Sequence, residues 1–123
     1  MTTRRPAVLM VNDHPPSRTA LRRALEGAGY TVWDAPSPVR LVSRLQVDRP
    51  DAVLLETRQA WTDCYALCRS LKRSPAFGHL PVLLLGARAP AARALESGCD
   101  RCLDSDGAPG SVLAALGELL EPR

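Results

Sequence analysis

Ala7-Val8-Leu9-Met10-Val11 is an unbroken apolar run, and the polar, proline-containing stretch Asn12-Asp13-His14-Pro15-Pro16-Ser17 follows it directly. A short run that is apolar on both faces is typical of a parallel strand covered by helices on both sides. Ser17 is expected to cap the next helix, and Gly29 to end it. That helix carries an apolar stripe at helical spacing: Leu21, Ala24, Leu25 and Ala28. The stretch therefore predicts one strand–helix unit.

The same order of apolar run, break and amphipathic segment recurs along the chain. Further strands are predicted at residues 30–33, 52–55, 80–85 and 101–103. Further helices are predicted at residues 39–46, about 63–73, 91–97 and 111–120. Strands that alternate with helices imply an α/β fold, here a doubly wound, five-stranded parallel sheet of (βα)5 type. We expect residues 1–123 to form a single domain with no output domain.

Composition excludes several classes of protein. The chain is 46% hydrophobic, which is ordinary for a globular protein and argues against disorder. Its longest apolar runs are far shorter than the ~18 residues that a membrane span needs. The apolar segment after the basic N-terminus is too short for a secretory signal. We therefore expect a cytoplasmic protein that does not contact the membrane.

Nucleic-acid binding and metal or redox chemistry are two further functions that the sequence could indicate. The net charge of +3 is spread along the chain, and Arg18, Arg22 and Arg23 are explained at least as well by a solvated helix face as by nucleic-acid binding. Cys64, Cys68, Cys99 and Cys102 could indicate zinc or redox chemistry. The predicted fold separates Cys64 from Cys99 at opposite edges of the sheet, so structural cysteines are favoured.

Ligands of open parallel sheets bind outside the carboxyl ends of the strands. The residues that directly follow or end the predicted strands are therefore the candidate site residues. They are Asn12, Asp13, Glu56, Gly86 and Ser105.

Three segments together resemble bacterial response-regulator receiver domains, the CheY-like family. They are Val8–Pro15 with Arg18 and Leu21, Pro50–Glu56, and Ala94–Asp100. The resemblance covers essentially the whole chain and implies the flavodoxin-like receiver fold. It also implies a site in which an acidic pair holds Mg²⁺ beside a phosphoacceptor aspartate, with a Ser/Thr and a Lys that bind the phosphoryl oxygens.

In this chain most of the family's site residues are replaced. Glu56 stands at the phosphoacceptor position, and Asn12 and Asp13 stand at the acidic pair. Gly86 and Ser105 occupy the Ser/Thr and Lys positions, and Cys102 occupies the aromatic switch position. The family's Met-Pro is Gln59-Ala60, and its glycine near the following helix is Cys64. The resemblance therefore implies a degenerate, or pseudo-receiver, domain with no catalytic residues and no enzymatic activity.

Several alternatives for this site stay open. Asp13 and Glu56 could still bind Mg²⁺ weakly, although no resident cofactor is expected. Glu56 could instead be a solvated carboxylate partnered by Asn12 or Arg58, or could mimic a permanent phosphoryl charge. The domain could also still accept a phosphoryl group on Asp13, Ser105 or Glu56.

The expected function is signal transduction through protein–protein interaction, independent of aspartyl phosphorylation. Candidate partners are a histidine kinase, another regulator or a second copy of the chain. The segment from Gly86 to Ser105 is about three residues shorter than is usual for the family, close to one helical turn. Its helix should therefore be short, with Pro90 in the first turn, and the partner surface atypical.

Overall fold

The computed structural model describes residues 5–12, 15–35, 41–56, 64–85, 98–103 and 109–120. These residues form a five-stranded sheet with the strand order β2-β1-β3-β4-β5, and every pairing is parallel. The predicted α/β fold is confirmed. The strands and helices in chain order are β1 (Ala7–Val11), α1 (Pro15–Gly27), β2 (Thr31–Ala35), α2 (Leu41–Asp48), β3 (Ala52–Glu56), α3 (Cys64–Arg73), β4 (Val82–Leu85), β5 (Arg101–Leu103) and α5 (Pro109–Leu120).

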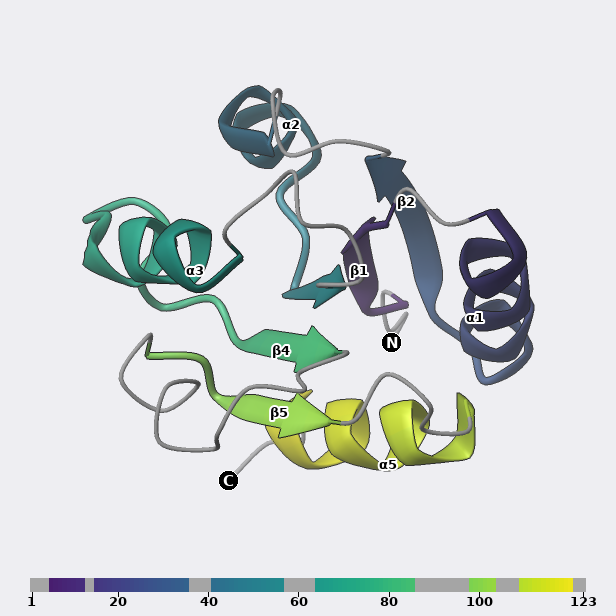
Figure 1. Cartoon of the computed structure of the whole chain (residues 1–123). Coiled ribbons are helices and arrows are strands. Elements are labelled where there is room, and N and C mark those ends of the chain that lie inside the picture. The colour runs from purple at the N-terminus through teal and green to yellow at the C-terminus, as the bar shows by residue number, and fades with distance from the viewer. Residues whose placement is uncertain are drawn as a thin grey trace.

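Of the described helices, α2 and α3 cover one face of the sheet, and α1 and α5 cover the other (Figure 1). Alternate residues of a strand point to opposite faces, so each central strand contributes to two cores. Leu9 and Val53 belong to the core beneath α2 and α3. Met10 and Leu54 belong to the core beneath α1 and α5. This arrangement explains the unbroken apolar runs in the sequence.

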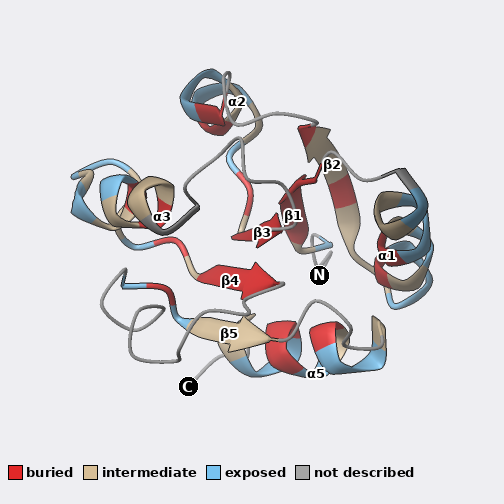
Figure 2. Cartoon of the chain, viewed as in Figure 1, coloured by how far each residue is buried: buried red, intermediate tan, exposed pale blue. Residues whose placement is uncertain are grey.

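The central strands are the most completely buried elements (Figure 2). All residues of β1, β3 and β4 are buried, whereas the edge strand β5 is only partly buried throughout. Burial of both faces stabilises a strand by about 1.5–3 kcal/mol for each large apolar side chain. The core therefore fixes the central strands, and with them the position of the strand ends.

Several element boundaries differ from the prediction. Ser17 is not an N-cap, because α1 already begins at Pro15, a residue type that the first helical turn accommodates well. Ala28 lies beyond the helix and is exposed. In α2, Leu41 and Leu45 are buried, whereas Val42, also at an apolar helical spacing, is 53% exposed.

Three residues with a positive φ follow helices or precede strands. Gly29 has a φ of 100° and Gly98 a φ of 85°, which the lack of a Cβ permits. Arg49 follows α2 with a φ of 50°, and its amide donates to the carbonyl of Leu45 at 3.2 Å. A left-handed conformation costs a residue with a side chain about 1–2 kcal/mol.

Two aspartates hold the amino edge of the sheet in the same way. Asp51 precedes β3, accepts the amide of Ala7 at 2.7 Å and donates its own amide to the Ala7 carbonyl at 2.7 Å. Asp100 precedes β5, accepts the amide of Val82 at 2.7 Å and donates to the Val82 carbonyl at 2.9 Å. Each carboxylate thus satisfies the first amide of a neighbouring strand.

Among the described helices, none combines the length and the apolar character that crossing a bilayer would require. The predicted helix at residues 91–97 and the Pro90 position lie outside the described residues.

Candidate functional site

The candidate site begins where β1 and β3 end side by side. Their register pairs Met10 with Leu54 and Val11 with Leu55, so one further step sets Asn12 opposite Glu56. Glu56 also pairs with Leu85 of β4. Along β3, Glu56 lies on the same face of the sheet as Ala52 and Leu54, which belong to the core beneath α1 and α5. The sheet therefore directs both polar side chains toward the face that α1 covers.

A hydrogen-bonded chain of three side chains connects these two residues to α1. The Asn12 amide nitrogen Nδ2 donates to the Ser17 hydroxyl oxygen at 3.3 Å. The Ser17 hydroxyl donates in turn to Oε1 of Glu56 at 3.0 Å. Ser17 thus bridges the residue after β1 and the last residue of β3. A hydrogen bond to a charged acceptor is stronger than one between neutral groups.

The expectation of a solvated Glu56 carboxylate is wrong. Glu56 is only 9% exposed and Asn12 only 3% exposed. A buried carboxylate needs hydrogen-bond donors to offset the loss of hydration, and the Ser17 hydroxyl is one of them. Arg58, the other expected partner, lies outside the described residues.

The arginines of α1 are engaged within the molecule. Arg18 donates to the backbone oxygen of Asn12 at 3.3 Å. Arg22 forms an ion pair with Asp34, another with Glu26 at 3.4 Å, and a hydrogen bond to the Val32 carbonyl at 3.3 Å. Arg23 is exposed and the Arg22 side chain is 41% exposed despite its ion pairs, so the expected solvated helix face fits both of them, whereas Arg18 is only partly exposed.

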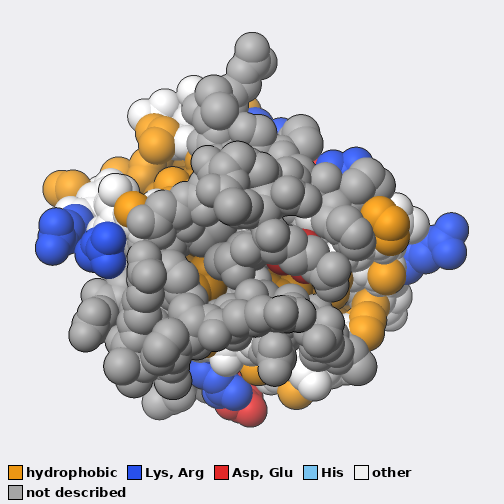
Figure 3. Space-filling view, in the orientation of Figure 1, with side chains coloured by type: hydrophobic (Ala, Val, Ile, Leu, Met, Phe, Trp, Pro, Cys, Tyr) orange, Lys and Arg blue, Asp and Glu red, His pale blue; other side chains and the backbone are white. Residues whose placement is uncertain are grey.

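The described basic side chains do not form one continuous patch on the face seen in Figure 3, where they lie at separate places around the rim. Arg101 forms an ion pair with Glu118. The arrangement of the described residues therefore offers no observation in favour of nucleic-acid binding on this face.

Three of the four cysteines have described side chains. Cys68 and Cys99 are buried thiols, and Cys102 is partly buried; all three pack in the core beneath α2 and α3. Within the described ranges, no group of three or more His, Cys, Asp or Glu side chains is arranged to hold a metal ion. Cys102 is the partner of Leu84 in β4, and its place at the family's switch position stays a prediction.

Asp13, Gly86 and Ser105 lie outside the described residues, as do Gln59 and Ala60. Their predicted roles stay predictions. The geometry of the site is therefore built from Asn12, Ser17 and Glu56.

Sequence reasoning missed Ser17 as a site residue. The signal was present, because Ser17, Leu21 and Leu25 follow one another at intervals of four residues and so share a helix face. Leu21 and Leu25 are buried against the sheet. A serine on that face, in the turn nearest the strand ends, was in position to contact Glu56.

With this fold and this position of the site, the chain belongs to the response regulator receiver domain family, whose model matches residues 8–116. It is thus a receiver domain of two-component signal transduction. Membership in this family does not by itself decide the chemistry of Glu56.

Response regulators of mycobacteria are among the curated relatives of the chain. The chain is 34% identical over 116 residues to the response regulator MprA of Mycobacterium ulcerans, which covers 92% of this chain and 49% of that protein. It is 33% identical to MprA of Mycobacterium tuberculosis, with 92% and 50% covered. The chain therefore spans about half the length of these relatives.

Solved structures agree with the fold. The signal receiver domain of a signal transduction histidine kinase from Syntrophus aciditrophicus has a TM-score of 0.85 at 29% identity, covering 94% of this chain and 89% of that one. The chemotaxis response regulator CheY4 of Vibrio cholerae has a TM-score of 0.84 at 20% identity, covering 95% and 100%.

Proposed function

We propose that this receiver domain signals through protein–protein interaction and independently of aspartyl phosphorylation. The observation that carries the proposal is the buried Glu56, whose Oε1 accepts the Ser17 hydroxyl at 3.0 Å. A carboxylate that attacks a phosphoryl donor must present an oxygen to that donor. At the acceptor position of this chain, one carboxylate oxygen is instead directed at α1.

The length of the side chain supports the same conclusion. Glutamate is one methylene longer than the aspartate that the family uses, so its carboxylate lies further from the strand. A displacement of about 1 Å from attacking geometry can reduce a rate 10²-fold. The hydrogen bond from Ser17 also holds the Glu56 carboxylate toward α1, which further reduces the rate expected for attack on a phosphoryl donor.

The residues around Glu56 fit magnesium poorly. Mg²⁺ binds proteins through carboxylates and retained water molecules, and Asn12 offers a neutral amide where the family has an acidic residue. The Glu56 carboxylate already accepts a hydrogen bond from the Ser17 hydroxyl. We expect weak Mg²⁺ binding at most.

The aromatic switch of the family has no counterpart at Cys102. A thiol on β5 that packs against the core is small and apolar. It cannot exchange between a buried and an exposed position in the manner of a large ring. Regulation through partner binding, rather than through a phosphorylation-driven switch, accords with this residue. The partner would be a histidine kinase, another regulator or a second copy of this chain.

Exposure to acetyl phosphate and Mg²⁺, followed by intact-mass measurement, tests the proposal. We expect neither the wild type nor Glu56→Gln to gain a phosphoryl group, while an aspartate-bearing receiver domain treated in parallel does. A gain in the wild type that Glu56→Gln abolishes would identify Glu56 as an acceptor and refute the proposal. A gain in both proteins would refute it by identifying another acceptor, such as Asp13 or Ser105.

Whether the charge of Glu56 contributes to partner binding is a separate part of the proposal. Glu56→Gln keeps an oxygen that accepts the Ser17 hydrogen bond but removes the charge. If Glu56 mimics a phosphoryl charge, this variant loses its partner in a pull-down and Glu56→Asp retains more binding. Equal binding by the wild type and Glu56→Gln excludes the mimic and leaves phosphorylation-independent binding intact.

A further inference from the structure

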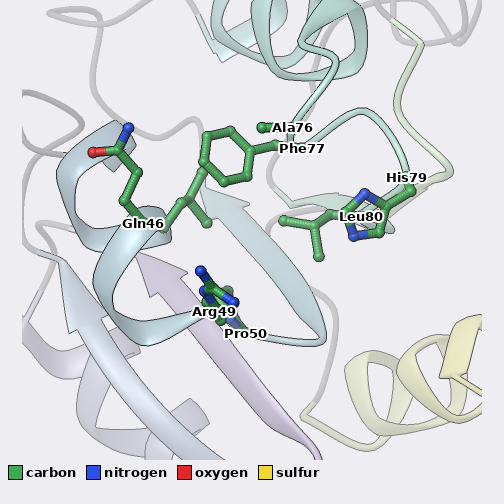
Figure 4. A pocket seen from close by; sticks show the side chains of 8 residues that line it. Gln46, Arg49, Pro50, Ala76, Phe77, His79 and Leu80 are labelled. Carbon is green, nitrogen blue, oxygen red and sulfur yellow. The ribbon is translucent and has the colours of Figure 1, made fainter.

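A cavity of about 380 Å³ lies at the amino edge of the sheet, between α2 and the segment that joins α3 to β4. This edge is opposite to the one that carries Glu56. Figure 4 shows Phe77 and Arg49 on facing sides of the cavity, with Gln46 at one end and Leu80 with His79 at the other. The volume of this cavity lies near the lower end of the range that is usual for ligand pockets, so the cavity could hold a small molecule.

The cavity has an apolar floor that belongs to the core. Leu45 and Leu80 line it and are buried, and Phe77 packs against the same core beneath α2 and α3. These side chains are held by the fold whether or not a ligand is present. An apolar body can therefore be buried without prior rearrangement of the floor.

The segment at residues 74–80 is held in place by its own hydrogen bonds. The amide of Gly78 donates to the Ser74 carbonyl at 2.8 Å, and the amide of Leu80 donates to the Phe77 carbonyl at 3.0 Å. A Cβ on Gly78 would lie 2.7 Å from the Lys72 carbonyl oxygen, so the backbone packs very closely there. The positions of Phe77 and His79 are thus preorganised, which lowers the entropic cost of binding.

Each polar side chain that lines the cavity can donate a hydrogen bond, and only Arg49 is a donor without an acceptor. Arg49 supplies a guanidinium, and Gln46 and His79 supply an amide and an imidazole. Among the described lining residues there is no Asp or Glu. Within the described ranges, the Arg49 and His79 side chains form no ion pair or hydrogen bond with another residue. Arg49 also has the left-handed backbone that is unusual for a residue with a side chain, and such outliers cluster at ligand sites.

From the cavity, its apolar floor and the Arg49 guanidinium together, we propose that this site binds a small organic anion: a carboxylate with an apolar, ring-sized body. The body lies against Phe77 and Leu80, and the carboxylate accepts hydrogen bonds from Arg49 and His79. Guanidinium and carboxylate pair with matching, two-pronged geometry. The site lies at the amino edge of the sheet, opposite to the edge that carries Glu56.

Two probes of the same shape and different charge, 2-naphthoate and 2-naphthamide, test the site by titration of the ¹⁵N-labelled chain. We expect naphthoate to shift the backbone amides of residues 45–49 and 76–80, and naphthamide to bind about tenfold more weakly. Arg49→Gln should weaken naphthoate about tenfold and leave naphthamide unchanged. Arg73→Gln, an exposed arginine outside the cavity, is the matched control and should change neither affinity.

Equal affinity of the wild type for the two probes would overturn the proposal, whether or not any variant folds. Shifts centred on other residues, or no shifts at all, would also overturn it. An equal loss in Arg49→Gln and Arg73→Gln would attribute the preference to general charge and would likewise overturn it.

Discussion

The hydroxyl of Ser17, in the first turn of α1, donates to Oε1 of Glu56 at the end of β3 across 3.0 Å, although 39 residues separate them in the chain. This contact connects a helix on one face of the sheet to the residue predicted to stand at the family's phosphoacceptor position. It also makes the first turn of α1 sensitive to the side chain at residue 56.

Loss of the Ser17 hydroxyl should destabilise the fold. Ser17→Ala removes one donor from a buried carboxylate, and we expect the free energy of unfolding to fall by about 1–3 kcal/mol. Urea denaturation of the wild type and the variant measures the change. Ser70→Ala, on an exposed position of α3, is the control and should stay within about 0.5 kcal/mol. A Ser17→Ala effect no larger than that of the control would contradict the strength assigned to this contact.

Two glycine-to-alanine substitutions should act in opposite directions. In Gly78→Ala the new Cβ would lie 2.7 Å and 2.8 Å from two backbone oxygens, so the loop must shift at a cost of about 1–3 kcal/mol. In Gly117→Ala the Cβ meets nothing within 4 Å inside α5. That variant should be more stable by about 0.5–1 kcal/mol. Thermal denaturation of both variants decides the matter, and a shift of the same sign in both would be inconsistent with the structure.

Arg49→Gly should stabilise the protein. Glycine adopts the φ of 50° without the steric cost of about 1–2 kcal/mol that arginine bears. The substitution also raises the entropy of the unfolded chain, which offsets part of this gain in stability. The net gain should be about 0.5–1 kcal/mol in urea denaturation. Arg49→Ala retains a Cβ and is the control, since it should give no such gain. Greater stability in both variants would trace the effect to the removed charge rather than to the backbone.

Asp100 should contribute more to stability than the ion pair it forms. Its Oδ2 accepts the Val82 amide at 2.7 Å and the ammonium group of Lys72 at 3.0 Å, and Lys72 also donates to the Leu80 carbonyl at 3.0 Å. Asp100→Ala should cost about 1–3 kcal/mol, because the Val82 amide loses its acceptor. Glu118→Ala, which removes an exposed ion pair with Arg101, should cost less than about 1 kcal/mol. Chemical denaturation ranks the two, and the reverse order would show that the strand amide is satisfied in another way.

Stability should decline in alkaline solution through Tyr30. Burial raises the pKa of the Tyr30 phenol above its ordinary value of 10.0, because the charged phenolate is poorly solvated there. The folded state therefore keeps a proton that the unfolded state releases. The contribution to stability is fully present below pH 10 and is lost as the pH rises through the folded pKa. Tyr30→Phe should flatten the fall in melting temperature above pH 10, and an unchanged slope would assign that fall to other groups.

The sequence predicts the fold well because strands that are buried on both faces appear in it as continuous apolar runs. Each central strand is a continuous apolar run, and Gly29 follows the end of α1 with the positive φ that a glycine permits. The less accurate points depend on tertiary contacts. Val42 is at an apolar helical position, yet it is 53% exposed. Arg49 takes a left-handed conformation that residue preference does not indicate.

The candidate site is predicted in position but not in its contacts. Parallel-strand topology correctly sets Asn12 and Glu56 at neighbouring strand ends. The burial of Glu56 and its hydrogen bond to Ser17 depend on the distance between α1 and the sheet, which the apolar side chains of both determine. No pattern in the sequence reports that distance.

The paired hydrogen bonds that Asp51 and Asp100 make to Ala7 and Val82 add resistance to local opening at the amino edge of the sheet. There, separating β1 from β3 or β4 from β5 breaks side-chain hydrogen bonds in addition to the backbone ladder. Local opening that begins at the first residues of β1 and β4 therefore costs more than the backbone hydrogen bonds alone would require.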